Sequence, residues 1–322
     1  AAGGVMVVIP YYLHNYEKFH RITILGEFLA VGALVMCLLF IVVDLGQPTR
    51  MLNVLLYPSP KSILFYDMLV LNGYLLINVL ISRITLDAEK KGIPPPIWIK
   101  WVIYLSIPWA ISIHTVTAFL YQGLAARPFW MTAIMAPRFL ASAFSAGPAL
   151  LIILCLILRK TTKFDVGTKP IQKLAQIVTY AMILNVFFVA MELFSGIYSS
   201  IPEHTSHFEF LFLGYDGNNT MVPWMWVSTV LAIISLVLLI NPKTRKDETT
   251  LVFACIAVYL SLWIDKGLGL VIAGMTPTPL HTVVDYWPTA IEAGVAMGVY
   301  AMGALIITAL YRMVLTIRRE TV

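Results

Sequence analysis

The chain alternates between long apolar stretches and short polar connections. A helix needs about 20 apolar residues to cross the roughly 30 Å hydrocarbon core of a bilayer. Eight stretches meet this requirement, at residues 23–43, 63–81, 102–121, 139–158, 174–198, 223–240, 251–275 and 290–314. None shows the alternation of a barrel strand, and a span in lipid must satisfy its own backbone hydrogen bonds. The pattern predicts an all-α integral membrane protein with eight full transmembrane helices.

Residues 1–14 form a further apolar stretch that is too short to cross a bilayer. A cleaved signal peptide would carry a basic region before its apolar region, and this stretch has none. We therefore expect it to be the end of a truncated N-terminal transmembrane helix.

The composition supports the membrane assignment. Of the 322 residues, 59% are hydrophobic and only 12% are charged, against roughly 45–50% and about 25% in soluble domains. The mean hydropathy is +0.83. A soluble fold of this size cannot bury so much apolar surface. Disordered proteins, secreted disulfide scaffolds and nucleic-acid binders are thereby excluded.

The formal net charge of +5 is explained by topology. Lys and Arg are concentrated in the connections 82–101, 159–173 and 241–250 and in the tail 311–322, and they are sparse in the alternate connections. Because basic connections stay in the cytoplasm, these segments and the C-terminus are predicted to be cytoplasmic, in a multi-pass inner-membrane protein. The connections 199–222 and 276–287 then face outward, where they form a docking surface for a partner.

The cysteines and histidines predict that the chain binds no metal, haem or iron–sulfur cluster. Cys37, Cys155 and Cys255 fall in apolar spans without CxxC or CxxCH spacing. Among six histidines, only His114 lies at membrane depth, whereas a bis-histidine haem needs two. A haem with one histidine and a different second ligand stays open.

Ionisable residues inside spans are costly in lipid and are functional candidates. At about 1.5 Å of rise per residue, all but Glu27 fall in the outer half of the membrane, and Glu27 lies toward the cytoplasm. This clustering predicts one polar pocket that opens to the outer face. The candidates are Glu27, Asp67, His114, Glu192, Asp265, Lys266 and Glu292, with Arg138 at a span entrance.

Each candidate also has a structural interpretation. The adjacent Asp265 and Lys266 are expected to point about 100° apart and to pair poorly, with one facing the bundle and the other snorkelling. Asp67 and Glu292 would reach the interface, and Glu192 would bond a neighbouring helix. His114 follows Pro108 by six residues, and proline loosens a helix. For His114 this favours a functional imidazole over a packing role.

Five motifs carry a family resemblance. They are DLGQP at 44–48, SIHTV at 112–116, RPFW at 127–130, APRFLASAF at 136–144 and GPA at 147–149. With them the chain resembles, nearly end to end, the NrfD-like family, the membrane subunits of polysulfide reductase and related complexes. The fit is closest to DsrP-type subunits of the Dsr sulfur-metabolism complex, with HmcC-type subunits next.

The resemblance implies two four-helix bundles without haem. They would occupy residues 23–158 and 159–322, the second with the cytoplasmic tail, after a truncated helix and loop in 1–22. It also implies a pocket for menaquinone or another quinone on the outer side. A ferredoxin-like iron–sulfur subunit would dock there, within a larger redox complex that also holds cytochromes.

A quinone exchanges two electrons and two protons, and we predict no redox centre in this chain, which would act as a subunit of a quinone oxidoreductase. His114 is expected to hydrogen-bond a quinone carbonyl, since imidazole exchanges protons near neutral pH. The predicted catalytic set is His114, Asp67, Glu192 and Asp265. The predicted quinone-binding set is His114, Arg138 and Glu292, and the predicted proton path is Glu27, Glu192, Asp265 and Lys266.

Two other classes stay open. Embedded carboxylates on several helices are equally typical of a transporter or an ion-translocating subunit. A purely structural anchor for iron–sulfur partners is the third hypothesis. Quinol-dependent reduction of the partner's clusters separates the three, because an anchor gives none and a transporter needs a gradient.

Overall fold

The computed structural model describes residues 2–14, 16–280, 282–284 and 286–318. His281 and the predicted cytoplasmic end, 319–322, lie outside these residues. Throughout the described part the chain is helical and contains no β-strand, only an isolated bridge between Tyr215 and Asn218. The predicted all-α class is confirmed.

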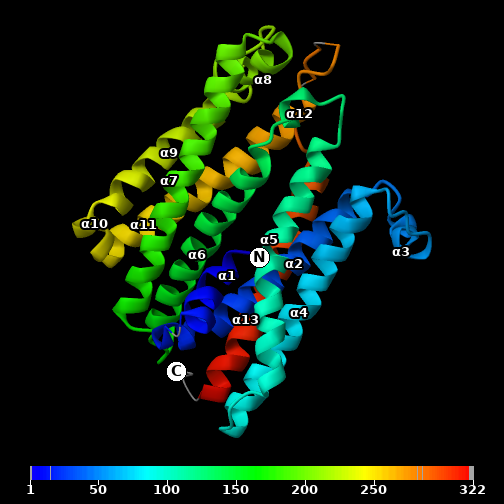
Figure 1. Ribbon diagram of the computed structural model, residues 1–322. Coiled ribbons are helices and arrows are strands. Elements are labelled where there is room, and N and C mark those ends of the chain that lie inside the picture. Colours follow the sequence, from blue (N-terminus) through cyan, green and yellow to red (C-terminus); the bar gives the residue numbers. More distant parts are fainter. Residues whose placement is uncertain (1, 15, 281, 285, 319–322) are drawn as a thin grey trace. The chain divides into compact units, whose positions relative to one another are not determined.

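Among the described residues, eight helical segments are long and apolar enough to cross a membrane (Figure 1). Each predicted span lies inside one of them, so the expected number of spans is confirmed. They are α2 (His20–Asp44), α4 (Ile63–Lys91), α5 (Ile97–Gln122), α6 (Met135–Thr161), α7 (Thr168–Ser199), α9 (Val222–Ile240), α13 (Ala290–Arg318) and a composite segment. The composite is α11 (Glu248–Trp263), the π-helix η6 (Ile264–Leu270) and α12 (Val271–Met275).

Short helices fill the N-terminal stretch and the connections. The apolar N-terminal stretch is helical in three pieces, η1 (Ala2–Gly4), α1 (Val5–Val8) and the π-helix η2 (Ile9–Leu13). The connections contain η3 (Glu17–Phe19), η4 (Pro48–Arg50), α3 (Asn53–Leu56), η5 (Pro128–Trp130), α8 (Pro202–Phe212) and α10 (Pro242–Lys246). At the start of α11 the Asp247 side chain accepts hydrogen bonds from the backbone N–H and hydroxyl of Thr250, which is N-capping.

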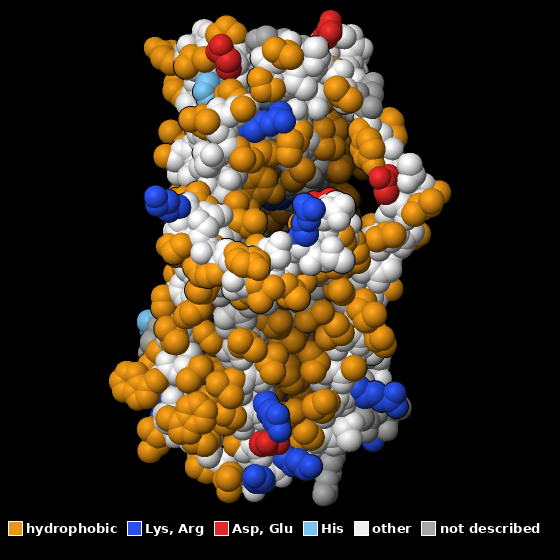
Figure 2. All heavy atoms as spheres, turned by 90° about the vertical axis from the view of Figure 1, so that its right-hand side faces the viewer, with side chains coloured by type: hydrophobic (Ala, Val, Ile, Leu, Met, Phe, Trp, Pro, Cys, Tyr) orange, Lys and Arg blue, Asp and Glu red, His pale blue; other side chains and the backbone are white. Residues whose placement is uncertain are grey.

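The surface is apolar in the manner of a lipid-facing protein. Large hydrophobic side chains are exposed along the spans, among them Leu76 on α4, Trp101 on α5 and Val237 on α9. Figure 2 shows one face on which hydrophobic side chains far outnumber charged ones. In lipid such exposure carries no hydrophobic penalty.

The helices form two compact units. Unit 1 comprises Ala1–Val116, Leu154–Ile171 and Trp287–Val322, and unit 2 comprises Thr117–Ile153 and Gln172–Tyr286. The implied division into four-helix bundles at residue 158 stays a prediction.

In unit 1, α2 packs against α4 and α13. The Tyr311 hydroxyl of α13 donates to the Leu25 carbonyl of α2 at 2.9 Å. Gly73 of α4 gives the Trp109 indole of α5 room, because a Cβ at this glycine would collide with the ring. The Trp109 Nε1–H donates to the Val70 carbonyl at 2.9 Å, which holds α5 against α4.

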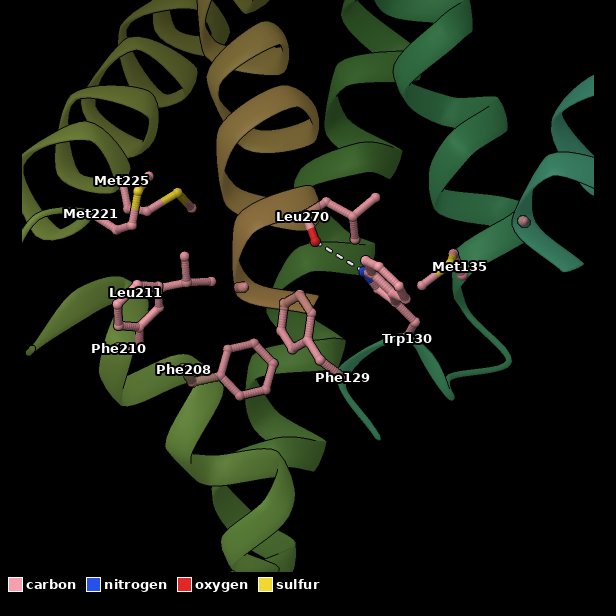
Figure 3. Packing of buried hydrophobic residues seen from close by; sticks show 11 residues of the cluster. Phe129, Trp130, Met135, Phe208, Phe210, Leu211, Met221, Met225 and Leu270 are labelled. Carbon is pink, nitrogen blue, oxygen red and sulfur yellow. Dashed lines mark hydrogen bonds between the residues drawn. The ribbon is translucent and has the colours of Figure 1, made fainter. Parts of the chain in front are cut away.

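Unit 2 has a core rich in aromatic residues and methionines, in which Trp130 lies between Leu270 and Met135 (Figure 3). The Trp130 indole N–H donates to the Leu270 carbonyl, at the end of the π-helix, at 2.9 Å. Gly274 leaves the space that the indole fills, because a Cβ there would overlap the ring. The fully buried Trp130 thus holds the 128–130 turn against η6 and α12.

Candidate functional site

Four of the predicted site residues meet inside unit 2. Arg138 on α6 donates through Nη1 to Glu192 Oε2 on α7 and through Nη2 to Asp265 Oδ1 on η6, the latter at 2.6 Å. These three side chains are each at most 10% exposed. The planar guanidinium group carries several N–H donors in fixed directions, so it can bond two carboxylates at once. The predicted bond from Glu192 to a neighbouring helix is therefore present.

Lys266 completes this charge cluster and corrects an expectation. Its Nζ lies 3.5 Å from Asp265 Oδ2 and 5.4 Å from the centre of the Phe139 ring. The prediction that Asp265 and Lys266 pair poorly is wrong. The segment is a π-helix rather than an α-helix, so its wider turn separates neighbouring side chains less, and the flexible lysine stem folds back over Phe139.

The charge cluster (Arg138, Glu192, Asp265 and Lys266) balances two basic and two acidic side chains. Buried charges are tolerated when paired and hydrogen-bonded, and removing one partner leaves an uncompensated charge. Three atoms within the cluster make no hydrogen bond with the described residues: Arg138 Nε, Asp265 Oδ2 and Lys266 Nζ. The cluster thus keeps hydrogen-bonding capacity for a further group.

A cavity of about 550 Å³ adjoins the cluster in unit 2. Its wall comes from α7, α8, α9, α11 and η6, and Asp265 is part of it. A smaller void of about 20 Å³, lined by Arg138, Glu192 and Asp265 among others, shares Asp265 and Phe208 with it. That volume is room for about one water molecule. The cluster and the cavity are therefore neighbours.

Two predicted residues lie at one level of unit 1. Asp67 precedes Val70 on α4, and His114 follows Trp109 on the antiparallel α5. At a rise of about 1.5 Å per residue, Asp67 lies about 4.5 Å along α4 from Val70, and His114 lies about 7.5 Å along α5 from Trp109. Because the two helices are antiparallel, both residues lie on the same side of the Trp109–Val70 hydrogen bond. Asp67 is 6% exposed. The His114 Nε2 is buried and has no hydrogen-bond partner among the described residues.

Glu27 and Glu292, also in unit 1, have local partners. Glu27 is buried in α2 and accepts from the Ser82 hydroxyl at 3.5 Å. Glu292 is exposed and accepts from the Thr289 N–H at 2.7 Å, while the Thr289 hydroxyl accepts from the Glu292 N–H at 3.3 Å. This capping box at the start of α13 gives Glu292 a structural role. The T-x-x-E spacing at 289–292 was a readable signal for it.

Sequence reasoning missed several polar groups of unit 2. Asn185, Glu209, Ser228 and Ser261 line the cavity, but uncharged or connection residues gave no signal. His207 on α8 is buried against Phe129, with ring centres 5.3 Å apart. Burial lowers the pKa of His207 below its usual 6.5, although hydrogen bonds to backbone at Thr276 and Ala273 oppose the shift.

In the described residues, no group of three or more His, Cys, Asp or Glu side chains is placed to hold a metal ion. Cys155 and Cys255 are buried and Cys37 is exposed, all three as free thiols. The absence of haem and clusters from this chain stays a prediction.

Spanning helices and buried charges define a multi-pass membrane protein with an internal polar site. The family model "Polysulphide reductase, NrfD" matches residues 1–277. The chain belongs to the NrfD family, as its motifs indicated.

Three relatives are similar to the chain over most of its length. The chain is 25% identical to a putative dimethyl sulfoxide reductase membrane subunit of Halobacterium salinarum, over 96% of this chain and 78% of that protein. It is 24% identical to the "Hdr-like menaquinol oxidoreductase integral membrane subunit" of Archaeoglobus fulgidus, over 95% and 78%. It is also 24% identical to a selenate reductase subunit of Mesobacillus selenatarsenatis, over 76% and 64%.

Proposed function

We propose that this chain is the quinone-reactive membrane subunit of a respiratory redox complex. The observation that carries the proposal is His114, an imidazole inside a membrane span whose Nε2 is buried and unpartnered among the described residues. A buried nitrogen without a partner is costly unless a ligand or water completes it. A quinone oxygen is such a ligand, and one relative is named a menaquinol oxidoreductase subunit.

In the proposal, His114 and Asp67 have different roles at the quinone site. His114 binds and orients the quinone oxygen through Nε2 and exchanges a proton there. Asp67, buried at the same level of α4, takes that proton up or returns it. The quinone itself supplies the two-electron chemistry, and the electrons pass to or from the partner. Glu292 belongs to the proposal as a residue at the edge of the site, beside its role in the capping box.

The charge cluster of unit 2 serves in the proposal as the proton-holding part of the chain. In this role Glu192 and Asp265 take up protons and Lys266 releases one, while Arg138 keeps the two carboxylates in place. Glu27, buried in α2, holds the cytoplasmic end of the path. Such a cluster also favours the second candidate function, an ion-translocating subunit. Proton movement in proteoliposomes without any quinone would favour that alternative.

The complex we propose has a ferredoxin-like iron–sulfur subunit on the outer face and further subunits that include cytochromes. Menaquinone is the expected quinone, and the DsrP-like motifs favour a sulfur-metabolism complex. The chain would lie in the inner membrane with its C-terminus in the cytoplasm, as the distribution of Lys and Arg favours.

The test is quinol-driven reduction of the iron–sulfur clusters in the assembled complex. His114→Ala removes a directional bond and a proton route, so we expect turnover to fall roughly tenfold to a hundredfold. Assembly should be nearly unchanged. Glu27→Gln is the comparison variant: it lies toward the predicted cytoplasmic side, so it should leave quinone affinity unchanged and lower turnover only through slower proton delivery.

Normal turnover and quinone affinity in His114→Ala would reduce the imidazole to a packing role. A wild-type complex with no quinol-dependent cluster reduction would show a structural anchor. Reduction that requires an ion gradient would instead identify a transporter.

A further inference from the structure

The cavity of unit 2 has the size and setting of a ligand site. Its volume of about 550 Å³ lies within the range of roughly 300–1,000 Å³ found for small-molecule sites. The wall is largely apolar and includes Phe208, Phe212 and Trp226. Ile197, Trp226 and Ile233 line it and are 52–59% exposed on membrane helices. A molecule dissolved in lipid can therefore reach the cavity from the side.

Two buried acceptors in this wall accept no hydrogen bond within the described part of the chain, and one of them, Asp265 Oδ2, has the Lys266 ammonium as an ion-pair partner at 3.5 Å. Asn185 is 3% and Asp265 is 7% exposed. Asn185 Oδ1 and Asp265 Oδ2 accept no hydrogen bond from the described residues. Asp265 is paired with Arg138 and Lys266 and is therefore a carboxylate, which only accepts. Burying acceptors that receive no hydrogen bond is costly, so a ligand or water that donates would stabilise this wall.

The hydroxyls in the wall do not meet this need. The Ser228 and Ser261 hydroxyls donate to each other's backbone carbonyls, at 2.8 Å and 2.9 Å. The Thr229 hydroxyl donates to the Met225 carbonyl at 2.8 Å, and the Thr205 hydroxyl to that of Ile201 at 3.0 Å. These hydroxyl donors are occupied, and two acceptors of the wall are open.

We propose that this cavity is a second binding site, for a membrane-borne amphiphile whose polar end carries hydroxyl donors. A quinol and a hydroxyl-bearing lipid headgroup share this chemistry. An oxidised quinone has only acceptor oxygens, so it can form no hydrogen bond with Asn185 Oδ1 or Asp265 Oδ2. The site uses none of the residues assigned to the quinone site of unit 1, and the proposal stands independently of that assignment.

The test compares two probes of one shape on the intact protein in phosphatidylcholine nanodiscs, under anaerobic conditions. The first is an alkylated 1,4-dihydroxynaphthalene, and the second is its 1,4-dimethoxy analogue, which has no donors. Binding is measured by calorimetry in wild type and in His114→Ala, so that binding at the unit 1 site is separated. We expect the dihydroxy probe to bind about tenfold more tightly in both, about the value of one hydrogen bond.

Three variants locate this preference. Asn185→Leu removes one open acceptor with a side chain of similar size, and the preference should fall to about twofold or less. Ala232→Trp fills the cavity and should abolish binding of both probes in the His114→Ala background. Asn78→Leu removes a buried asparagine of α4, whose Nδ2 donates to the Tyr74 carbonyl at 2.8 Å, and should leave the preference unchanged.

Equal affinity for the two probes, or a preference that survives Asn185→Leu and Ala232→Trp, overturns the proposal. A final arm adds phosphatidylglycerol to the nanodiscs. Weaker binding of the dihydroxy probe then assigns the site to a hydroxyl-bearing lipid, and unchanged binding assigns it to a quinol. Neither result bears on quinol-driven turnover at His114, which is measured separately.

Discussion

The two units differ in how they partner the ionisable residues predicted for the site. In unit 2, Arg138 joins acids from two other helical segments, and Lys266 lies beside one of them. In unit 1, Glu27 accepts a long hydrogen bond of 3.5 Å from the neutral Ser82 hydroxyl, and the His114 Nε2 has no hydrogen-bond partner among the described residues. Side chains that pair with one another stabilise the fold. A buried polar atom without a hydrogen-bond partner is available to a ligand, and it lowers the stability of the protein.

The units also share one packing device. In each, an indole fills the space beside a glycine and donates to a backbone carbonyl of the neighbouring segment: Trp109 at Val70 and Trp130 at Leu270. The packing is therefore alike where the polar chemistry differs. The difference between the units lies in which ionisable side chains the helices bring into contact.

The largest expected effect tests the paired side of this comparison. Arg138→Met leaves two buried carboxylates, Glu192 and Asp265, with Lys266 as the one remaining cation of the cluster, which should cost about 3–5 kcal/mol in the free energy of unfolding. Equilibrium unfolding in mixed micelles measures it. The quadruple variant Arg138→Met, Glu192→Gln, Asp265→Asn and Lys266→Met removes all four charges of the cluster and should recover most of the loss. A single variant as stable as wild type would show that the pairs contribute nothing.

Neutralising one acid in each unit sharpens the contrast. Glu192→Gln weakens a charge-assisted bond to Arg138 and should cost about 1.5–3 kcal/mol. Glu27→Gln keeps an acceptor for the Ser82 hydroxyl and removes a buried ionisable group, so the free energy of unfolding should stay within about 0.5 kcal/mol of wild type or rise. The same micelle unfolding measurement compares them. Equal losses would mean that unit 1 also depends on the carboxyl group of Glu27.

The shared packing device should respond alike in both units. Trp109→Phe and Trp130→Phe each keep an aromatic ring and lose one N–H bond to a carbonyl. Each should cost about 1 kcal/mol in the free energy of unfolding, plus whatever the smaller ring leaves unfilled. A cost confined to one unit would show that the two indoles are not equivalent.

The smallest effect concerns pH. Burial lowers the pKa of His207 on α8, so the unfolded chain binds its proton more readily than the folded one. Stability should therefore fall as the pH drops below about 6.5 and stay level above it. Thermal midpoints between pH 5 and 8 measure the slope, and His207→Gln should flatten it. An unchanged slope in that variant would assign the pH dependence to other groups.

The sequence alone determined the class of the protein, the number of full spans and the membership of the NrfD family. Length and hydropathy suffice for the spans, because lipid allows an isolated segment of this kind only one backbone conformation. The candidate site residues could also be named from the sequence, because an ionisable residue within an apolar span is recognisable without a structure.

Only the tertiary structure decided which candidates meet. Position along a span follows from counting residues, but the rotation of each helix and the identity of its neighbours follow from packing between segments far apart in sequence. For that reason Arg138, Glu192 and Asp265, each on a different helical segment, could not be joined in advance. The π-helix at Ile264–Leu270 changed the pairing of Asp265 and Lys266, because it alters the local turn that an α-helical count assumes. The cavity beside them was equally hidden, since an apolar wall has the same composition whether or not it encloses a space.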